Sequence, residues 1–582
     1  MQWTKIKKYL YILPIGLILG VTPLIVHYKK VNLGNVVASY WIKDVNTDFF
    51  SYYKMVFFLG FILAAFLSFY IYIKKEKKLK KTFYYIPLAI YTIMVIISTV
   101  LSEAKLTSLM GFPDRYEGLP VLMGYILLIV FTVNLINSKK QIEFLLKILL
   151  VSALIIGLIG IFQFFGYDFF QSNLGKNIIT TFAEVENIGE RLKFRFDDQN
   201  IIYSTFYNPN YVGSYFAMLL MLTMVIYLFA KSGLNKFIYG AITLLMFANW
   251  LGSLSRAGIL GVLFSSVITG LLLYKQIIAR WKSMLVIIIC FCLVFTGMDY
   301  FTGGKLRKEF FSLGQETRLA VKGEVPKIKE INTADNSLTF STENNKLLIS
   351  FDKDDNLILR DNNGTKLSYH KEKQKVINKE DNDDKQNNKM IHIDNEKYRD
   401  FKFILHSNNK TDKSNNSKIL ELYYNNKQIN FIYNNNRFSV IGMRGNIYPI
   451  KEVESWGFED RENLASARGY IWSRSLPLVK ETLWKGFGPD TYAMYFPQHD
   501  VIGKFKAFGN AAKIVDKPHN IYLQIAINTG LISLIAVLIL FAVYFFRGIS
   551  LFWKSNYQNW YARAGVGVFG AFTAYAVAGF FN

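Results

Sequence analysis

Eleven apolar stretches, each close to the length of one membrane crossing, constrain the fold of this chain more than any other feature. A helix needs roughly 20 apolar residues to cross the hydrocarbon core of a bilayer. The sequence therefore predicts an all-α polytopic membrane protein with about 11 to 12 transmembrane helices. The stretches cover approximately residues 9–26, 55–73, 83–101, 119–136, 144–166, 211–230, 237–251, 257–274, 284–298, 520–546 and 565–581.

Lysine and arginine in the short connections predict the orientation, because these residues favour the cytoplasmic side of a membrane. The basic clusters fall on alternate sides of consecutive helices, so all of them face one compartment. We therefore expect a multi-pass membrane protein with its long loop outside the cytoplasm. The clusters lie near residues 5–8, 74–81, 139–140, 231–236, 275–282 and 547–563, and the predicted outer segments are 28–54, 103–118, 167–210, 252–256 and 299–517.

The chain divides into five parts on this pattern. A transmembrane bundle of about nine helices covers 1–299, and an outer-surface linker covers 300–330. A β-rich extracytoplasmic insert covers 331–455, and a candidate catalytic loop with an amphipathic helix covers 456–519. C-terminal transmembrane helices cover 520–582.

The insert is predicted from short runs of alternating apolar and polar residues that are bounded by Asn and Gly, a pattern typical of β-hairpins. We expect strands near 337–341, 346–351, 356–360, 402–406, 419–424, 428–433 and 438–441, and disorder near 371–389. Residues 331–455 carry 20 Lys and Arg against 18 Asp and Glu, so the net charge of +24 lies mainly at the membrane edges. Attraction to anionic lipid explains that charge, and we expect membrane lipids but no nucleic acid as partners.

Two arginines are candidate anion-binding residues on the predicted outer face. Arg256 lies where one apolar stretch ends and the next begins, and Arg468 lies late in the long loop. Arg468 shares an apolar stripe with Trp472, so we expect its guanidinium to point toward the membrane. A planar guanidinium can donate two parallel hydrogen bonds to a diphosphate. The alternative is that each arginine only reaches toward lipid headgroups.

His519 is the candidate general base. It follows Pro518 at the predicted first turn of a membrane helix, where the positive end of the helix dipole favours a neutral imidazole. A neutral ring can accept a proton from a hydroxyl group, and this chemistry needs neither a metal nor a cofactor. The alternative is a structural histidine at the start of the helix.

Further outer residues are expected to complete the site. Arg115 is a third candidate for diphosphate binding and Glu117 a second-choice base, although the two could simply pair with each other. Asn208 and Asn210 are supporting residues that could be no more than a helix cap, and Asn520 supports His519.

The chain resembles the O-antigen ligase and O-antigen polymerase family of bacterial membrane glycosyltransferases. The resemblance rests on the motifs at 114–119, 208–210, 255–258, 468–472, 485–489 and 519–523. It implies a GT-C-like helical bundle that takes glycan from an undecaprenyl-diphosphate donor and passes it to a glycan, lipid or protein acceptor. It also implies that Arg256 and Arg468 hold the diphosphate and that His519 activates the acceptor in a metal-independent, inverting transfer. The chain departs from the family in its β-rich insert and in showing eleven stretches where twelve are usual.

Two other classes of protein fit parts of the pattern. A polysaccharide flippase or transporter would place its basic residues in a central cavity, whereas these arginines and the histidine stand at helix ends. A non-catalytic glycan-binding surface protein would depend on the insert. Deleting residues 331–455 distinguishes the classes, because an enzyme should keep some turnover and a receptor should lose all binding.

Overall fold

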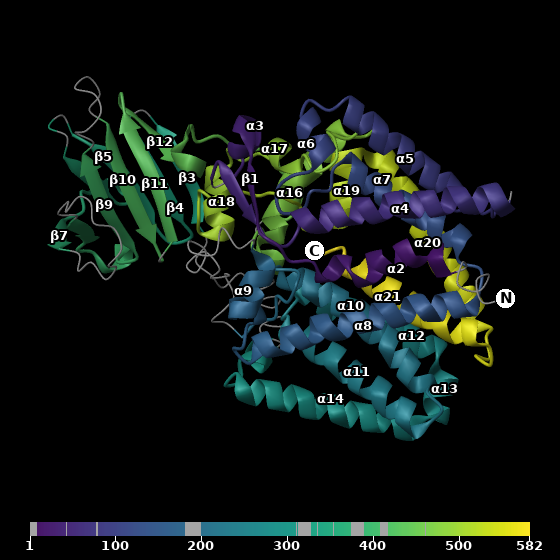
Figure 1. Ribbon diagram of the computed structural model, residues 1–582. Coiled ribbons are helices and arrows are strands. Elements are labelled where there is room, and N and C mark those ends of the chain that lie inside the picture. The colour runs from purple at the N-terminus through teal and green to yellow at the C-terminus, as the bar shows by residue number, and fades with distance from the viewer. Residues whose placement is uncertain are drawn as a thin grey trace.

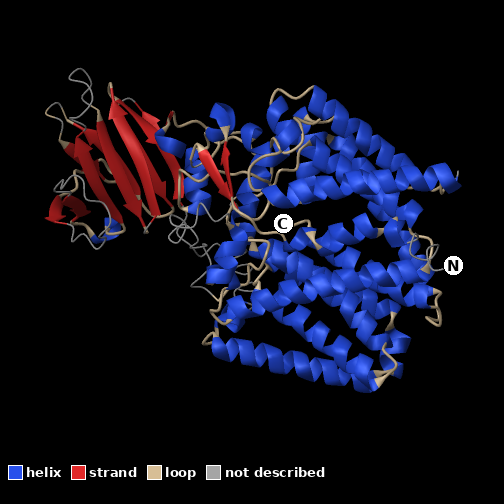
Figure 2. Cartoon of the chain, viewed as in Figure 1, coloured by secondary structure: helices blue, strands red, loops and turns tan. Residues whose placement is uncertain are grey.

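The computed structural model consists of a large helical body and a β-rich region beside one end of it (Figure 1; Figure 2). The structure describes residues 9–581 except 42, 77–78, 181–199, 310, 312–327, 335, 353, 355, 374–388, 408–416, 426 and 460. Every one of the eleven predicted apolar stretches overlaps a helix. These helices are α2 (Leu13–Gly20), α4 (Tyr52–Glu76), α5 (Tyr85–Val100), α7 (Leu119–Leu135), α8 (Lys139–Phe164), α10 (Pro209–Phe229), α11 (Gly233–Gly252), α12 (Arg256–Leu272), α14 (Trp281–Phe301), α19 (Ile521–Thr529), α20 (Leu531–Trp553) and α21 (Trp560–Ala578).

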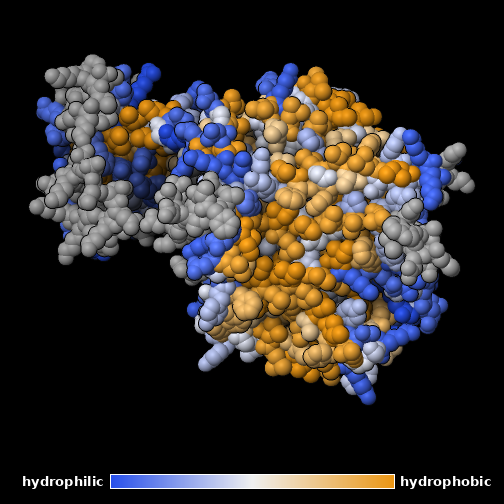
Figure 3. Space-filling view, viewed as in Figure 1, coloured by the Kyte–Doolittle hydropathy of each residue, from blue (hydrophilic) through white to orange (hydrophobic). Residues whose placement is uncertain are grey.

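The surface of the helical body is that of a membrane protein. Five of the described helices, α4, α8, α10, α14 and α20, are long and apolar enough to cross a bilayer, and four shorter helices are also apolar. Figure 3 shows hydrophobic side chains over most of the visible body, with hydrophilic side chains gathered at its two ends. Large apolar side chains such as Leu63, Leu263 and Phe546 are more than half exposed. Such a surface is stable against lipid and not against water.

Helix α10 forms the centre of the body, where it packs against α11, α12 and α21. It is the most deeply buried of the five long apolar helices. Its N-terminus is fixed locally, because the Asn208 side chain accepts a hydrogen bond from the backbone N–H of Asn210 at 2.9 Å, and Pro209 occupies the first turn. The start of α10 therefore gives the neighbouring site a rigid wall.

The tenth predicted stretch is two helices instead of one. Gly530, with φ of +100°, separates α19 from α20. The N–H of Leu531, the first residue of α20, donates to the carbonyl of Thr482 at 2.9 Å, so the break is held by the loop that precedes it. Because only glycine adopts this backbone angle at little cost, the single helix predicted over 520–546 is wrong at this point.

The β-rich region is confirmed, and it consists of two antiparallel sheets packed face to face. One sheet has the strand order β13-β12-β11-β10-β9-β8-β7 and the other β3-β4-β5-β6. All seven predicted strands are present, whereas β3, β7, β8 and β13 were not predicted. The strands are β3 (Ile328–Ala334), β4 (Ser337–Thr342), β5 (Lys346–Phe351), β6 (Leu357–Arg360), β7 (Tyr369–Lys373), β8 (Lys389–Ile393), β9 (Phe401–Ser407), β10 (Lys418–Tyr424), β11 (Lys427–Asn434), β12 (Arg437–Ile441) and β13 (Ile447–Tyr448).

Apolar and polar side chains alternate along each strand, and this alternation explains how the two sheets pack. Alternate side chains of β10, such as Leu420, Leu422 and Tyr424, point into the core that the sheets share. The segment predicted to be disordered, 371–389, has strand residues at both ends. Its middle, 374–388, lies outside the described residues.

A helix from the following loop completes this core. Val501 and Phe505 of α18 (Val501–Phe508) lie in the same hydrophobic cluster as the two sheets, and Phe505 is fully buried. Lys506 Nζ also donates to the carbonyl of Lys329. The β-rich region is therefore built partly from the loop that leads to His519. The remaining α-helices and strands are α3 (Gly34–Ala38), α6 (Lys105–Met110), α9 (Asn173–Ile179), α13 (Tyr274–Ala279), α16 (Leu464–Glu481), α17 (Tyr492–Tyr495), β1 (Lys29–Asn32) and β2 (Val45–Asp48).

Candidate functional site

His519 stands in the short connection that enters α19. The N-cap of this helix is Asn520, whose Oδ1 accepts hydrogen bonds from the N–H groups of Tyr522 and Leu523, each at 3.0 Å. His519 therefore precedes the helix instead of lying in its first turn, which corrects the position expected from the sequence. Its φ of +50° is unusual for a residue with a side chain, so the surrounding contacts must hold it. One of them is the hydrogen bond from Trp472 Nε1 to the carbonyl of Pro518 at 2.9 Å.

The structure brings His519, Arg256 and Arg468 to one polar cavity of about 320 Å³. Arg256 is the first residue of α12, Arg468 lies in α16, and His519 precedes α19, so three separate elements supply them. Asn210 also lines this cavity, and its Oδ1 accepts a hydrogen bond from Ser255 Oγ at 3.2 Å. Asn208 and Asn520 are absent from the lining that the described residues form, and both act as helix caps.

Arg468 is held inside the protein and does not point to lipid as the apolar stripe predicted. Its side chain donates to the carbonyl of Ala465 at 2.8 Å and to that of Phe581 at 2.7 Å. The left-handed turn at 465–467 and the close approach of Gly469 to the Arg461 carbonyl bring this part of α16 into place. A β-carbon at Gly469 would lie 2.2 Å from that oxygen, so the glycine that follows Arg468 has a steric cause.

The electrostatics of this cavity favour an anion. Arg256, Arg468 and Lys513 line it together with one carboxylate, Asp516. Burial, and then the charge of Arg256, lowers the pKa of Arg468 to about 10, so the cation remains charged at neutral pH but is destabilised by its surroundings. Arg468 Nε is buried and has no hydrogen-bond partner among the described residues. An anionic group in the cavity would relieve both costs.

The surroundings of His519 keep its ring neutral. Burial lowers its pKa well below the ordinary value, the nearby charge of Lys517 adds to this effect, and Asp516 opposes it. Nδ1 is buried without a hydrogen-bond partner in the described part of the chain. The neutral state predicted from the helix dipole is therefore also favoured by desolvation and by neighbouring cations.

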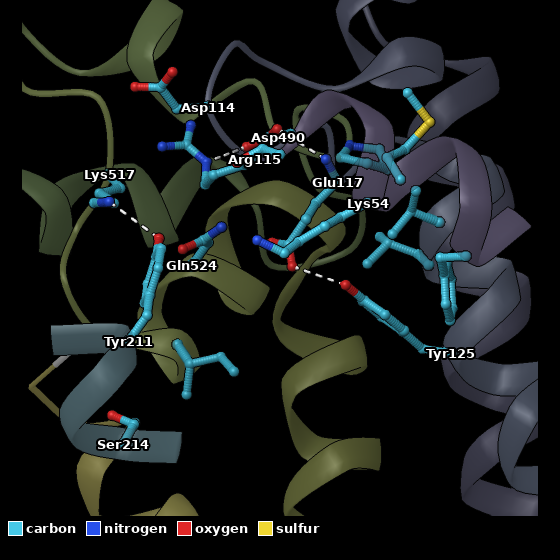
Figure 4. Close-up of a pocket in the computed structure, with 18 of the residues that line it drawn as sticks. Lys54, Asp114, Arg115, Glu117, Tyr125, Tyr211, Ser214, Asp490, Lys517 and Gln524 are labelled. Atoms are coloured by element: carbon cyan, nitrogen blue, oxygen red, sulfur yellow. Dashed lines mark hydrogen bonds and ion pairs between the residues drawn. The ribbon is translucent and has the colours of Figure 1, made fainter. Parts of the chain in front are cut away.

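Arg115 and Glu117 lie in a second, larger cavity of about 710 Å³ (Figure 4). Arg115 is engaged in two ion pairs, with Asp490 at 2.7 Å and with Asp516 at 2.6 Å, and its side chain is only 6% exposed. Glu117 accepts a hydrogen bond from Tyr125 at 3.3 Å. Burial, and then the charge of Asp490, raises the pKa of Glu117. The structure thus separates these two residues from the cavity that contains Arg256, Arg468 and His519.

The segment that contains Arg468 and His519 matches a known protein family. Residues 422–538 match the family model described as O-Antigen ligase. This match supports an O-antigen ligase or polymerase-like family for the chain, and a membrane protein of surface-glycan assembly. No curated protein and no solved structure matches the chain.

The segment matched to the O-antigen ligase family contains site residues that the sequence patterns did not single out. Asp490 fixes Arg115 and also accepts from the N–H groups of Phe112 and Glu117. Asp516 and Lys517 immediately precede Pro518-His519. Their closeness in sequence to the candidate base was the signal that could have identified them as site residues. The ligase match does not include Arg256, Arg115 or Glu117, which lie earlier in the chain.

Proposed function

We propose that the chain is a metal-independent, inverting glycosyltransferase. It polymerises or ligates glycan from an undecaprenyl-diphosphate-linked donor on the outer face of the bacterial cytoplasmic membrane. The observation that carries this proposal is the convergence of Arg256, Arg468 and His519 on one cavity. The match to the O-antigen ligase family supports the same class of substrate.

The donor's diphosphate would occupy the smaller cavity, where three cations face one carboxylate. Arg468 would donate from its unpaired Nε, and Arg256 would approach from the start of α12. Hydrogen bonds between charged partners are about twice as strong as neutral ones, and both arginines would stabilise the charge that grows on the leaving diphosphate.

His519 would accept the proton of the acceptor hydroxyl. In the transfer, the acceptor oxygen forms a bond to the anomeric carbon while the bond from that carbon to the diphosphate oxygen breaks. The hydroxyl proton passes to a ring nitrogen, and the electron pair of the broken bond leaves with the diphosphate. A single displacement of this kind inverts the anomeric configuration. A bound diphosphate would also offset the charges of Lys517 and Arg468 that lower the pKa of His519, so the base would become stronger once the donor is present.

The proposed setting is a bundle of 11 to 12 transmembrane helices with the β-rich region outside the cytoplasm. Its partners would be the lipid-linked donor, membrane lipids, and an acceptor that is a glycan, a lipid or a protein. The long apolar helices and the hydrophobic surface of the helical body support this setting.

Membranes that contain each variant and are supplied with diphosphate-linked glycan test the proposal. We expect His519→Ala and Arg468→Ala to insert normally, to lose product and to accumulate the lipid-linked donor. The matched controls are His499→Ala and Arg461→Ala, whose side chains are exposed and line neither cavity, and both should retain turnover. Unchanged product from both site variants would exclude the mechanism.

A further inference from the structure

We propose that the larger cavity binds an uncharged, hydroxyl-rich amphiphile. A saccharide would lie at the polar mouth, and a hydrocarbon tail would enter the helical body. Given the proposed function, this molecule is the acceptor of the transferred glycan. The binding itself does not depend on that role.

The depth of the cavity indicates an amphiphile. The polar end of its lining, here called its mouth, includes Arg115, Glu117 and Lys517, which stand in loops. Its lining reaches Leu128 in α7 and Met218 in α10, each nine residues from the first residue of its helix. At about 1.5 Å per residue this depth is roughly 14 Å, close to half the hydrocarbon thickness of a bilayer.

The charges that line this cavity do not favour an anionic head group. Three cations and three carboxylates line it, so their formal charges cancel; they are Lys54, Arg115, Lys517, Asp114, Glu117 and Asp490. The cations already have partners. Lys54 Nζ donates to the carbonyl of Thr205, Lys517 Nζ donates to the hydroxyl of Tyr211, and Arg115 is held by its two carboxylates. A diphosphate would gain more in the smaller cavity, where cations exceed carboxylates by two.

The side chains around the mouth suit a saccharide. Figure 4 shows Lys54, Tyr211 and Gln524 directed toward the middle of the cavity, with the Glu117 and Tyr125 pair beside them. Five tyrosines line the cavity, at positions 91, 125, 211, 215 and 575. Tyrosine rings offer flat apolar faces with a polar tip, and carboxylate and amide groups accept hydrogen bonds from hydroxyl groups.

A second, independent observation points to a polar ligand in the same cavity. Asn528 lines the cavity and is only 4% exposed, and its Oδ1 has no hydrogen-bond partner among the described residues. An unsatisfied buried acceptor is costly, and a hydroxyl donor from a ligand would remove that cost.

The two cavities are neighbours, which fits a donor in one and an acceptor in the other. In two places, one residue lines the smaller cavity and the next residue in the chain lines the larger one. Asn210 lines the smaller cavity and Tyr211 the larger, and Asp516 lines the smaller and Lys517 the larger. A saccharide at the mouth of the larger cavity would therefore lie close to His519.

Photo-crosslinking of the full chain in lipid nanodiscs tests the inference. The probe is dodecyl maltoside with a diazirine in its alkyl chain, and the competitors are unlabelled dodecyl maltoside and dodecyl phosphate. We expect saturable labelling of the peptides around Leu128 and Met218. Dodecyl phosphate should compete about tenfold more weakly than the maltoside, equivalent to about 1.4 kcal/mol. Comparable competition by the phosphate would overturn the proposal, as would labelling that does not saturate.

Variants locate the labelled site. Met218→Trp and Leu128→Trp fill the apolar end from two different helices, and each should reduce labelling to about a tenth. The matched control is Leu263→Trp, at a side chain that is 56% exposed on α12, and labelling there should be unchanged. Equal labelling in the control and in both cavity variants would overturn the proposal. The wild-type competition decides the question even if a variant does not fold.

The same preparations separate this inference from the proposed function. His519→Ala should retain maltoside labelling whether or not product formation is lost. Normal product in His519→Ala would reject the proposed chemistry and leave the binding site intact, whereas absent labelling in active wild-type protein would reject only the binding site.

Discussion

Arg115 Nη1 lies 2.6 Å from Asp516 Oδ2, and the pair joins residues that are 401 positions apart. Arg115 lines the larger cavity and Asp516 the smaller one, so the ion pair forms part of the wall between them. Burial alone would raise the pKa of Asp516, but the charges of Lys517 and Arg115 lower it. One guanidinium thus fixes the loop that leads to the candidate base.

Replacing Arg115 with Ala should destabilise the protein strongly. The change removes the guanidinium that pairs with Asp490 and Asp516, and Asp490 is almost fully buried. Breaking a buried pair in this way costs about 3 to 5 kcal/mol. Thermal unfolding of the solubilised protein measures the effect. The control is Lys139→Ala, which breaks the exposed pair with Glu143 and should cost less than about 1 kcal/mol.

His519 should make the protein less stable as the pH falls. Its folded-state pKa lies below the unfolded value of about 6.5, so the unfolded chain binds the proton more readily. The stability that the neutral ring contributes is present above pH 6.5 or so and is lost progressively toward the folded-state pKa. Melting temperatures of the wild type and of His519→Gln between neutral pH and about pH 4 test this sign. If acidification raised the melting temperature of the wild type relative to that of His519→Gln, the prediction would be contradicted.

Phe505 should be essential for the β-rich region and for the loop that follows. Its ring is fully buried between the sheets, so Phe505→Ala should cost about 3 to 5 kcal/mol, as for other large core residues. Phe546→Ala, at a side chain that is 69% exposed, should change the melting temperature little.

The same packing changes what deletion of residues 331–455 is expected to show. The deletion alone should expose Val501 and Phe505 and cause aggregation. Polar replacements at both positions are needed before turnover of the shortened chain is informative. A soluble, monodisperse deletion variant with both residues intact would contradict this expectation.

Two glycine substitutions should have opposite effects. Gly530→Ala forces a β-carbon into a φ of +100° at the break between α19 and α20 and should destabilise the protein by more than about 1 kcal/mol. Gly60→Ala lies within α4, where no atom stands within 4 Å of the added carbon, and should stabilise the protein by about 0.5 to 1 kcal/mol. Melting temperatures of both variants measure the contrast, and equal shifts would contradict it.

The amino-acid sequence alone determined where the helices and most strands lie. Apolar length and period-two alternation are properties of neighbouring residues, so the eleven apolar stretches and the seven strands could be found without the fold. It also indicated Arg256 and His519, which stand at the ends of apolar stretches, and Arg468, which shares an apolar stripe with Trp472 in the long loop.

The tertiary structure alone decided which charges meet. Asp490 and Asp516 hold Arg115, Arg468 turns inward to the carbonyl of Phe581, and Phe505 enters a core that is made of other strands. These contacts join segments far apart in the chain, and local hydrophobicity carries no information about them. The division into one cationic cavity and one neutral cavity follows from those contacts, because an arginine that is already paired cannot hold a further anion as strongly.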